Sequence, residues 1–222
     1  MVNRSYGQYC GFARALEVVG ERWALLIVRD LLVGAKRFTD LLSGLPGIPS
    51  NVLSARLREL EHNNVVRRRV LARPARAVVY ELTAYGLELE RVVVELGRWG
   101  AKALGDPRPG ETLTTDSLIT ALRSTFHPEA AVGFRAGYEV RVGELVLHAR
   151  IDDGSIAVGA GPLPDADLTI AAGPGIRALM AGELSPAAAI ENGTVQVLSG
   201  NPELLHRFAD IFRIEPMPVA RS

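Results

Sequence analysis

The sequence contains a single cysteine, Cys10, which excludes an intramolecular disulfide framework. No apolar run approaches the ~18–20 residues that cross a bilayer. The first residues lack the apolar stretch of a secretion signal. These absences predict a cytoplasmic protein that does not contact a membrane.

The usual signatures of catalysis and metal binding are also missing. The four histidines show no metal-ligand spacing, and there is no second cysteine to join them. No Gly-x-Ser-x-Gly elbow occurs, and the glycines between residues 159 and 173 do not form a phosphate-binding loop. We therefore expect the chain not to be an enzyme and to need neither a metal nor another cofactor.

Charge is unevenly distributed, although the formal net charge is zero. Residues 1–105 contain 16 Lys and Arg against 10 Asp and Glu, whereas residues 106–222 contain 9 against 15. This split predicts two modules with different partners, of which the basic one suits a polyanion. The alternative is that both halves have ordinary solvated surfaces.

A short segment rich in proline and glycine, Gly105-Asp-Pro-Arg-Pro-Gly110, is the clearest break in the chain. Such a segment neither continues a helix nor forms a central strand. It predicts an N-terminal domain over residues 1–105, a linker over 106–110 and a C-terminal domain over 111–222.

The first half reads as the element order of a winged helix-turn-helix. Hydrophobic periodicity predicts helices over 12–19, 23–33, 38–42 and 51–63, the last with Ser50 as its N-cap. Two strands over 65–71 and 77–82 then form a hairpin, and Thr83 caps a long helix that runs to Leu104.

The helix over 51–63 is the candidate recognition helix. Leu53, Leu57 and Leu60 share one face, and the opposite face is short and polar, which suits a major groove. Five arginines in the hairpin repel one another without a partner, and phosphates would relieve this repulsion. A plain surface helix is the alternative. The predicted DNA contacts are Lys36, Arg37, Ser50, Asn51, Ser54, Ala55, Arg58, Arg73 and Arg76.

The last helix of this half is apolar on two sides. Its broad face carries Leu89, Val92, Val93, Leu96 and Trp99 and can pack on its own domain. A second stripe predicts the interface of a homodimer, or else a contact with the C-terminal domain. That stripe consists of Leu87, Val94 and Ala101.

These residues resemble the HxlR family of bacterial regulators from about Tyr9 to Gly105. The motifs that carry the resemblance are Gly20-Glu-Arg-Trp23, Leu45-Pro-Gly-Ile48, Leu53-Ser-Ala-Arg-Leu-Arg-Glu-Leu60 and Tyr80-Glu-Leu-Thr83. The resemblance implies a dimeric winged helix on operator DNA, with dimer contacts from the N-terminal and last helices.

The resemblance also bears on Cys10, because some family members sense oxidants or electrophiles with a cysteine at this position. Sensing needs an accessible thiolate, and Arg14 lies one helical turn away, where it can lower the thiol pKa. The alternative is a small buried hydrophobic residue.

The second half predicts an α+β domain, in which an antiparallel sheet carries helices on one side. Helices are expected over 116–126, 174–181, 186–191 and from Asn201, with strands over 131–135, 138–142, 144–151, 155–160, 167–171 and 194–198. Small motifs between about Thr112 and Phe212 resemble the sterol carrier protein 2-like fold, which implies an apolar ligand tunnel. They are Asp167-Leu-Thr-Ile170, Gly182-Glu-Leu-Ser-Pro186, Gly193-Thr-Val-Gln-Val197 and Gly200 before a closing helix. The alternative is a core without a cavity. The candidate ligand-binding residues are Leu122, Phe126, Ile176, Leu179, Met180, Leu205 and Phe208.

Together these features predict a dimeric bacterial transcriptional regulator. We expect it to bind double-stranded DNA at an inverted repeat and to respond to a small hydrophobic effector in its C-terminal domain. One alternative is a carrier of lipids or other hydrophobic ligands whose winged helix serves only dimerisation. A lesser alternative is a redox-sensing or electrophile-sensing regulator that acts through Cys10.

Overall fold

The computed structural model describes residues 5–72 and 76–217 of the chain. They form two compact units that divide between Val93 and Val94. In the described residues, no helix is both long and apolar enough to cross a membrane.

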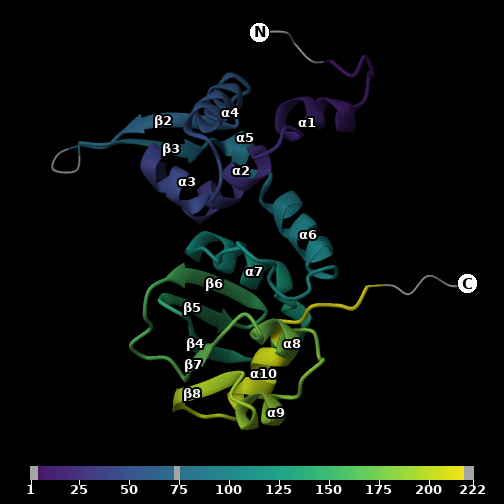
Figure 1. Ribbon diagram of the computed structural model, residues 1–222, viewed down its shortest axis with the longest axis vertical. Helices are drawn as coiled ribbons and strands as arrows, with labels where there is room; N and C mark the ends of the chain where they lie inside the picture. Colours follow the sequence, from purple (N-terminus) through teal and green to yellow (C-terminus); the bar gives the residue numbers. More distant parts are fainter. Residues whose placement is uncertain (1–4, 73–75, 218–222) are drawn as a thin grey trace, which may run out of the picture. The chain divides into compact units, whose positions relative to one another are not determined.

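The N-terminal unit combines helices with a three-stranded antiparallel sheet of order β1-β3-β2. Figure 1 labels β2 and β3 of this sheet. Its core is a single hydrophobic cluster to which α2, α3, α4 and the sheet contribute. The elements are α1 (Gly11–Val19), α2 (Ala24–Val33), β1 (Lys36–Arg37), α3 (Phe38–Gly44), α4 (Ser50–His62), β2 (Val66–Val70), β3 (Val78–Leu82) and α5 (Ala84–Leu87). This is the predicted order of a winged helix-turn-helix, with β1 added.

The predicted long helix after the hairpin is divided into α5 and α6 (Glu90–Ala101). Thr83 caps α5 as expected, because its hydroxyl accepts a hydrogen bond from the Gly86 amide at 3.0 Å. Only glycine fits at Gly86, where an added Cβ would lie 2.1 Å from the carbonyl oxygen of Val65. The Leu89 amide then bonds to the Gly86 carbonyl in a tight turn, and α6 starts anew. The prediction of one continuous helix was wrong.

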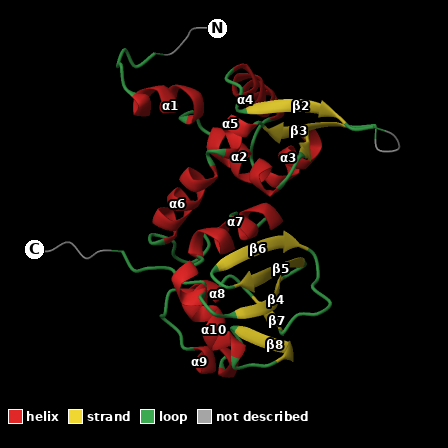
Figure 2. Ribbon diagram, turned by 180° about the vertical axis from the view of Figure 1, so that it is seen from behind, coloured by secondary structure: helices red, strands yellow, loops and turns green. Residues whose placement is uncertain are grey.

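The C-terminal unit is an α+β layer with a five-stranded sheet of order β6-β5-β4-β7-β8 (Figure 2). After α6 its elements are α7 (Thr115–Thr125), the 3-10 helix η1 (Pro128–Ala131), β4 (Arg135–Val142), β5 (Leu145–Asp152), β6 (Ser155–Ala160), β7 (Leu168–Ala172), α8 (Ile176–Met180), α9 (Pro186–Glu191), β8 (Val195–Gly200) and α10 (Leu204–Ile211).

Two expectations about this sheet were wrong. The sheet is mixed, because β4 and β7 pair in parallel while its other neighbours are antiparallel. Residues 131–135 are also no strand of their own. Pro128 starts the 3-10 helix η1 there, Gly133 adopts a positive φ of 69°, and β4 begins only at Arg135.

The helices of this unit share one face of the sheet, as predicted. Side chains of α7, α8, α9 and α10 form one hydrophobic cluster with the strands. At its centre, Tyr138 of β4 packs edge-on against Phe208 of α10, with ring centroids 5.5 Å apart. On the opposite face, Glu139 accepts a hydrogen bond from the Leu163 amide at 2.8 Å and so holds the loop between β6 and β7.

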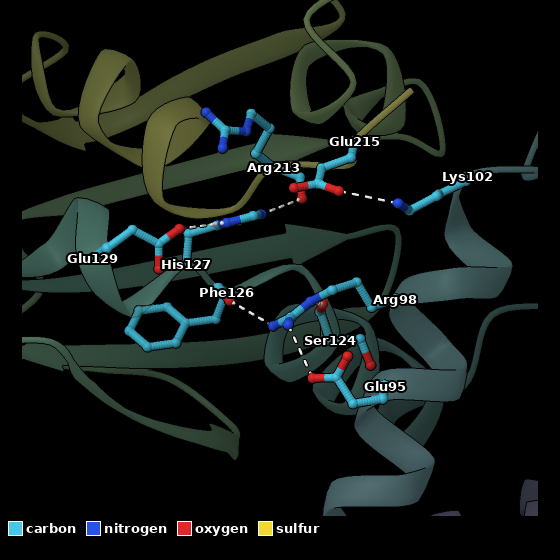
Figure 3. Close-up of polar contacts among 9 residues, drawn as sticks. All are labelled: Glu95, Arg98, Lys102, Ser124, Phe126, His127, Glu129, Arg213 and Glu215. Atoms are coloured by element: carbon cyan, nitrogen blue, oxygen red, sulfur yellow. Dashed lines mark hydrogen bonds and ion pairs between the residues drawn. The ribbon is translucent and has the colours of Figure 1, made fainter. Parts of the chain in front are cut away.

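Helix α6 is attached to the C-terminal unit by its second half (Figure 3). The Arg98 guanidinium donates hydrogen bonds to the carbonyls of Ser124 and Phe126, both at 3.0 Å, and so caps the C-terminus of α7 with a positive charge. Lys102 pairs with Glu215 at 3.0 Å. The division between the units therefore lies inside α6, ahead of the segment 105–110 where the sequence predicted it.

Candidate nucleic-acid interface

Helix α4 has the two faces that the sequence predicted. Leu53, Leu57 and Leu60 are buried in the N-terminal core. The other side remains accessible: Ser50, Asn51 and Arg58 are exposed, whereas Ser54 and Ala55 are half-buried. This polar surface, together with its basic residue, is suited to base edges in a major groove.

Ser50 does not cap α4, which corrects the prediction. The helix begins one residue earlier than expected, so Ser50 is its first residue and Pro49 occupies the N-cap position. Pro49 has an extended backbone, and its carbonyl accepts the first helical hydrogen bond from the Leu53 amide at 3.0 Å. Ser50 itself lies at the exposed start of the helix.

The two arginines of α4 lie in different surroundings. Arg56 is turned to the protein, where it forms ion pairs with Glu59 and Glu21. Arg58 is exposed and donates only to the Ser54 carbonyl of its own helix, at 3.2 Å; among the described residues it has no carboxylate partner. Arg58 is therefore the cation of this face whose charge is available to a ligand.

The wing, which we define as β2, β3 and their connection, carries its arginines on both faces. Arg67 and Arg69 each donate through Nε to Glu81 of β3, at 2.8 and 2.7 Å. The Arg68 guanidinium lies on the opposite face, 5.7 Å from the ring centroid of Tyr80. Glu81 is thus one partner that the arginine cluster finds within the chain, and it neutralises part of the charge.

The remaining predicted basic contacts lie on β1 and at the wing tip. Arg37 is exposed and Lys36 half-buried, and both are placed beside β3 by the pairing of Lys36 with Tyr80 and of Arg37 with Val79. Arg76 is exposed, with a positive φ of 29°. Arg73 lies outside the described residues. Strand β1 was not predicted, because a two-residue strand has no recognisable periodicity.

Cys10 is exposed and occupies the N-cap position of α1. Hydrogen bonds from the backbone of Ala13 and, next, of Phe12 lower the pKa of its thiol. Arg14 is not the cause, contrary to expectation, because its guanidinium pairs with Glu17 at 2.6 Å. The alternative of a buried hydrophobic cysteine is wrong.

The apolar residues of α6 agree with the prediction only in part. Of the expected dimer stripe, Leu87 is exposed, Val94 is half-buried, and Ala101 packs against the C-terminal core. Val92, Leu96 and Trp99, which were expected to pack on their own domain, are exposed; Trp99 reaches 72%. Val93 and Leu89 pack on the N-terminal core as expected, and the contact of Ala101 agrees with the alternative that the second stripe meets the C-terminal domain.

The seven candidate ligand residues all belong to the core of the C-terminal unit. Six are buried, and Ile176 packs partly buried against them. Their aromatic member Phe208 lies between Tyr138 and Phe212, whose ring centroids are 5.5 and 4.7 Å away. They are thus brought together, and they contact each other and the sheet. A ligand site at these residues stays a prediction.

Comparison with known proteins identifies relatives of the first half. A family model described as HxlR-like helix-turn-helix matches residues 18–107. The uncharacterized HTH-type transcriptional regulator YvaP of Bacillus subtilis (strain 168) is 36% identical over 91 residues, 41% of this chain and 84% of the relative. The HTH-type transcriptional regulator YodB of the same organism is 36% identical over 99 residues, 45% of this chain and 86% of the relative.

Solved structures match the same part of the chain. The redox regulator HypR in its oxidized form is 32% identical and covers 44% of this chain and 100% of its own, with a TM-score of 0.40. Reduced YodB from B. subtilis is 35% identical and covers 45% of this chain and 100% of its own, with a TM-score of 0.39.

The sequence relatives confirm the resemblance that the first half predicted. These matches do not test the resemblance of the second half to sterol carrier protein 2, which stays a prediction. This chain aligns with more than four fifths of both YvaP and YodB at 36% identity. It therefore belongs to the family of HxlR-like helix-turn-helix transcriptional regulators.

Proposed function

We propose that this chain is a dimeric regulator that acts in the cytoplasm and binds an inverted-repeat operator. In this proposal α4 enters the major groove, and the wing contacts the DNA backbone. The observation that carries it is the exposed face of α4, where Arg58 lies without a carboxylate partner among the described residues. Asn51 is exposed on the same face, one and two helical turns from the half-buried Ser54 and from Arg58.

The test begins with selection of genomic DNA fragments by the purified full chain, which supplies an operator. Arg58→Ala should then weaken operator binding by ~1–3 kcal/mol and relax the base preference at one position of each half-site. Fluorescence anisotropy with the selected duplex and with single-base variants measures both effects.

The matched control is Arg56→Ala in the same helix. Arg56 is engaged with Glu59 and Glu21, so its loss should leave the base preference unchanged. Equal base preference in the Arg58→Ala and wild-type proteins would contradict the placement of α4. A full chain that selects no DNA would instead favour the carrier of hydrophobic ligands.

For the dimer we propose the exposed stripe of Val92, Leu96 and Trp99 on α6. These residues are spaced by four and three positions, so they form one continuous helical stripe. Each leaves about half or more of its surface in contact with water. Large apolar side chains grouped in this way are typical of an interface, and a second copy of α6 offers a matching surface.

A second candidate function, sensing of electrophiles, is favoured by the exposure and lowered thiol pKa of Cys10. If it holds, benzoquinone should add to the thiol of the full chain and change its affinity for the operator. Mass spectrometry and anisotropy measure the two effects. Cys10→Ser is the control, and an equal response of this variant would exclude the cysteine.

The effector of the C-terminal unit stays a separate proposal. Its support is the grouping of apolar side chains from α7, α8 and α10 in one cluster. A fatty acid or terpenoid that binds the folded chain should raise its melting temperature, and it alters operator affinity only if it binds two states differently.

A further inference from the structure

We propose that Glu81 is the positioning residue of the wing: it presents Arg67 and Arg69 as a joined pair of guanidinium groups to the DNA backbone and limits the charge they deliver. The inference rests on the proposed DNA binding and names the group that controls it. Glu81 touches the two arginines rather than the nucleic acid.

The strand register brings the three side chains together. Glu81 of β3 is directly opposite Arg67 of β2, and Arg69 lies two residues further along the same strand. Side chains two residues apart point to the same face of a strand, about 6.6–6.8 Å from one another. A glutamate opposite the first arginine and diagonal to the second can therefore reach both.

Each carboxylate oxygen of Glu81 serves a different arginine. Oε1 accepts from Arg67 Nε at 2.8 Å, and Oε2 accepts from Arg69 Nε at 2.7 Å. Both bonds use the inner nitrogen of the guanidinium. The terminal nitrogens of both arginines make no hydrogen bond within the described part of the chain, and these donors suit phosphate oxygens.

Exposure separates the carboxylate from the arginines. The side chain of Glu81 is only 16% exposed, whereas those of Arg67 and Arg69 are 65% and 48% exposed. The negative charge thus lies close to the sheet, and the positive groups extend over it into the solvent. Hydrogen bonds from Arg69 and Arg67 lower the pKa of Glu81, which keeps the carboxylate ionised.

Two consequences follow for DNA binding. The three groups carry one net positive charge instead of two, so non-specific attraction to phosphates is weaker. The paired arginines are also held in place before DNA arrives, which favours a backbone of matching shape over any other. Glu81 therefore raises the preference for the operator relative to other DNA.

Two variants separate charge from position. Glu81→Gln removes the charge, and the amide offers only one oxygen to the two arginines. Glu81→Asp keeps the charge, but its side chain is one methylene shorter and no longer reaches both arginines. Binding of the full chain is measured from 50 to 300 mM salt on the selected operator and on a 30-base-pair duplex of random sequence.

Glu81→Gln should bind the random duplex about five- to tenfold more tightly at 0.1 M salt and steepen the salt slope by up to ~0.9. Glu81→Asp should keep the wild-type slope. Both variants should lower the ratio of operator to random-duplex affinity. Glu183→Gln is the matched control, since it frees Arg177 from an ion pair in the other unit and adds the same charge.

Melting temperatures of all variants show whether the wing is folded. The proposal is overturned if both Glu81 variants retain the wild-type slope and affinity ratio, or if Glu183→Gln changes them equally. It is also overturned if Glu81→Gln weakens both duplexes by the same factor, because that result indicates a purely structural carboxylate. A wild-type chain that binds neither duplex refutes the proposed function itself.

Discussion

At the scale of single residues, close contacts between a helix backbone and neighbouring side chains decide which substitutions the helix tolerates. Gly97 of α6 lies against α7, and an added Cβ would come within 2.4 Å of the Ser124 hydroxyl oxygen. That hydroxyl is buried and has no hydrogen-bond partner among the described residues. One glycine thus permits the close approach of α6 and α7 inside the C-terminal unit.

Gly97→Ala should therefore destabilise the protein by ~1–3 kcal/mol through overpacking, despite the better helix propensity of alanine. Adding Ser124→Ala should restore most of this loss, because the clashing oxygen is removed. Urea unfolding followed by circular dichroism measures both.

Gly100→Ala is the control in the same helix, since an added Cβ there meets no atom of residues 5–72 or 76–217 within 4 Å. It should stabilise the protein by up to ~1 kcal/mol. If both glycine variants behave alike, Gly97 is not a contact that requires glycine.

At the scale of elements, periodicity predicted most of the helices and strands but not what covers them. The spacing of Leu53, Leu57 and Leu60 alone identifies the buried side of α4. Helix α6 is apolar on more than one side, so its pattern does not indicate which side remains in water. Which side of α6 is covered depends on residues far along the chain, such as Ser124 and Phe126, whose carbonyls accept hydrogen bonds from Arg98.

The exposed apolar stripe of α6 leads to a prediction about assembly. Leu96→Glu places a charge in the proposed stripe and should convert the dimer to a monomer, because an unpaired carboxylate is costly to bury. Analytical ultracentrifugation measures the mass. Since Leu96 is exposed in the single chain, the fold should persist.

Leu87→Glu distinguishes this surface from the stripe that the sequence predicted. It alters an exposed leucine of α5 and should leave the dimer intact. Dissociation by Leu87→Glu but not by Leu96→Glu would restore the original assignment, and a monomeric wild-type chain would rule out both.

At the scale of the whole molecule, the sequence predicted the two layers of the C-terminal unit but not its strand order. A strand pattern looks the same whether its partner runs parallel or antiparallel. Just before β7, the Gly137 amide donates to the Asp167 side chain at 2.7 Å and the Asp167 amide donates to the Gly137 carbonyl at 2.8 Å. A single aspartate in a loop gives no recognisable signal in advance.

The packing around Phe208 allows a test of whether the apolar residues of this unit fill a core or line a ligand site. Phe208 is fully buried between two aromatic rings, so Phe208→Ala should cost ~3–5 kcal/mol of stability. Phe208→Trp should also destabilise the unit by overpacking. Urea unfolding of the full chain with and without a saturating fatty acid distinguishes a filled core from a ligand cavity. If Phe208→Trp keeps the wild-type stability but is no longer stabilised by the fatty acid, a ligand cavity lies at Phe208.

Helix α6 contributes Val93 to one hydrophobic core and Ala101 to the other, so the choice of domain boundary affects both units when fragments are expressed. A cut at the segment 105–110 follows the prolines and glycines, but it removes the second half of α6 from the unit that contains its partners. The carbonyls of Ser124 and Phe126 then lose the Arg98 cap, and Glu215 loses Lys102. A junction ahead of Glu90 keeps these contacts, but it removes Val93 from the N-terminal core, so neither cut leaves both units complete.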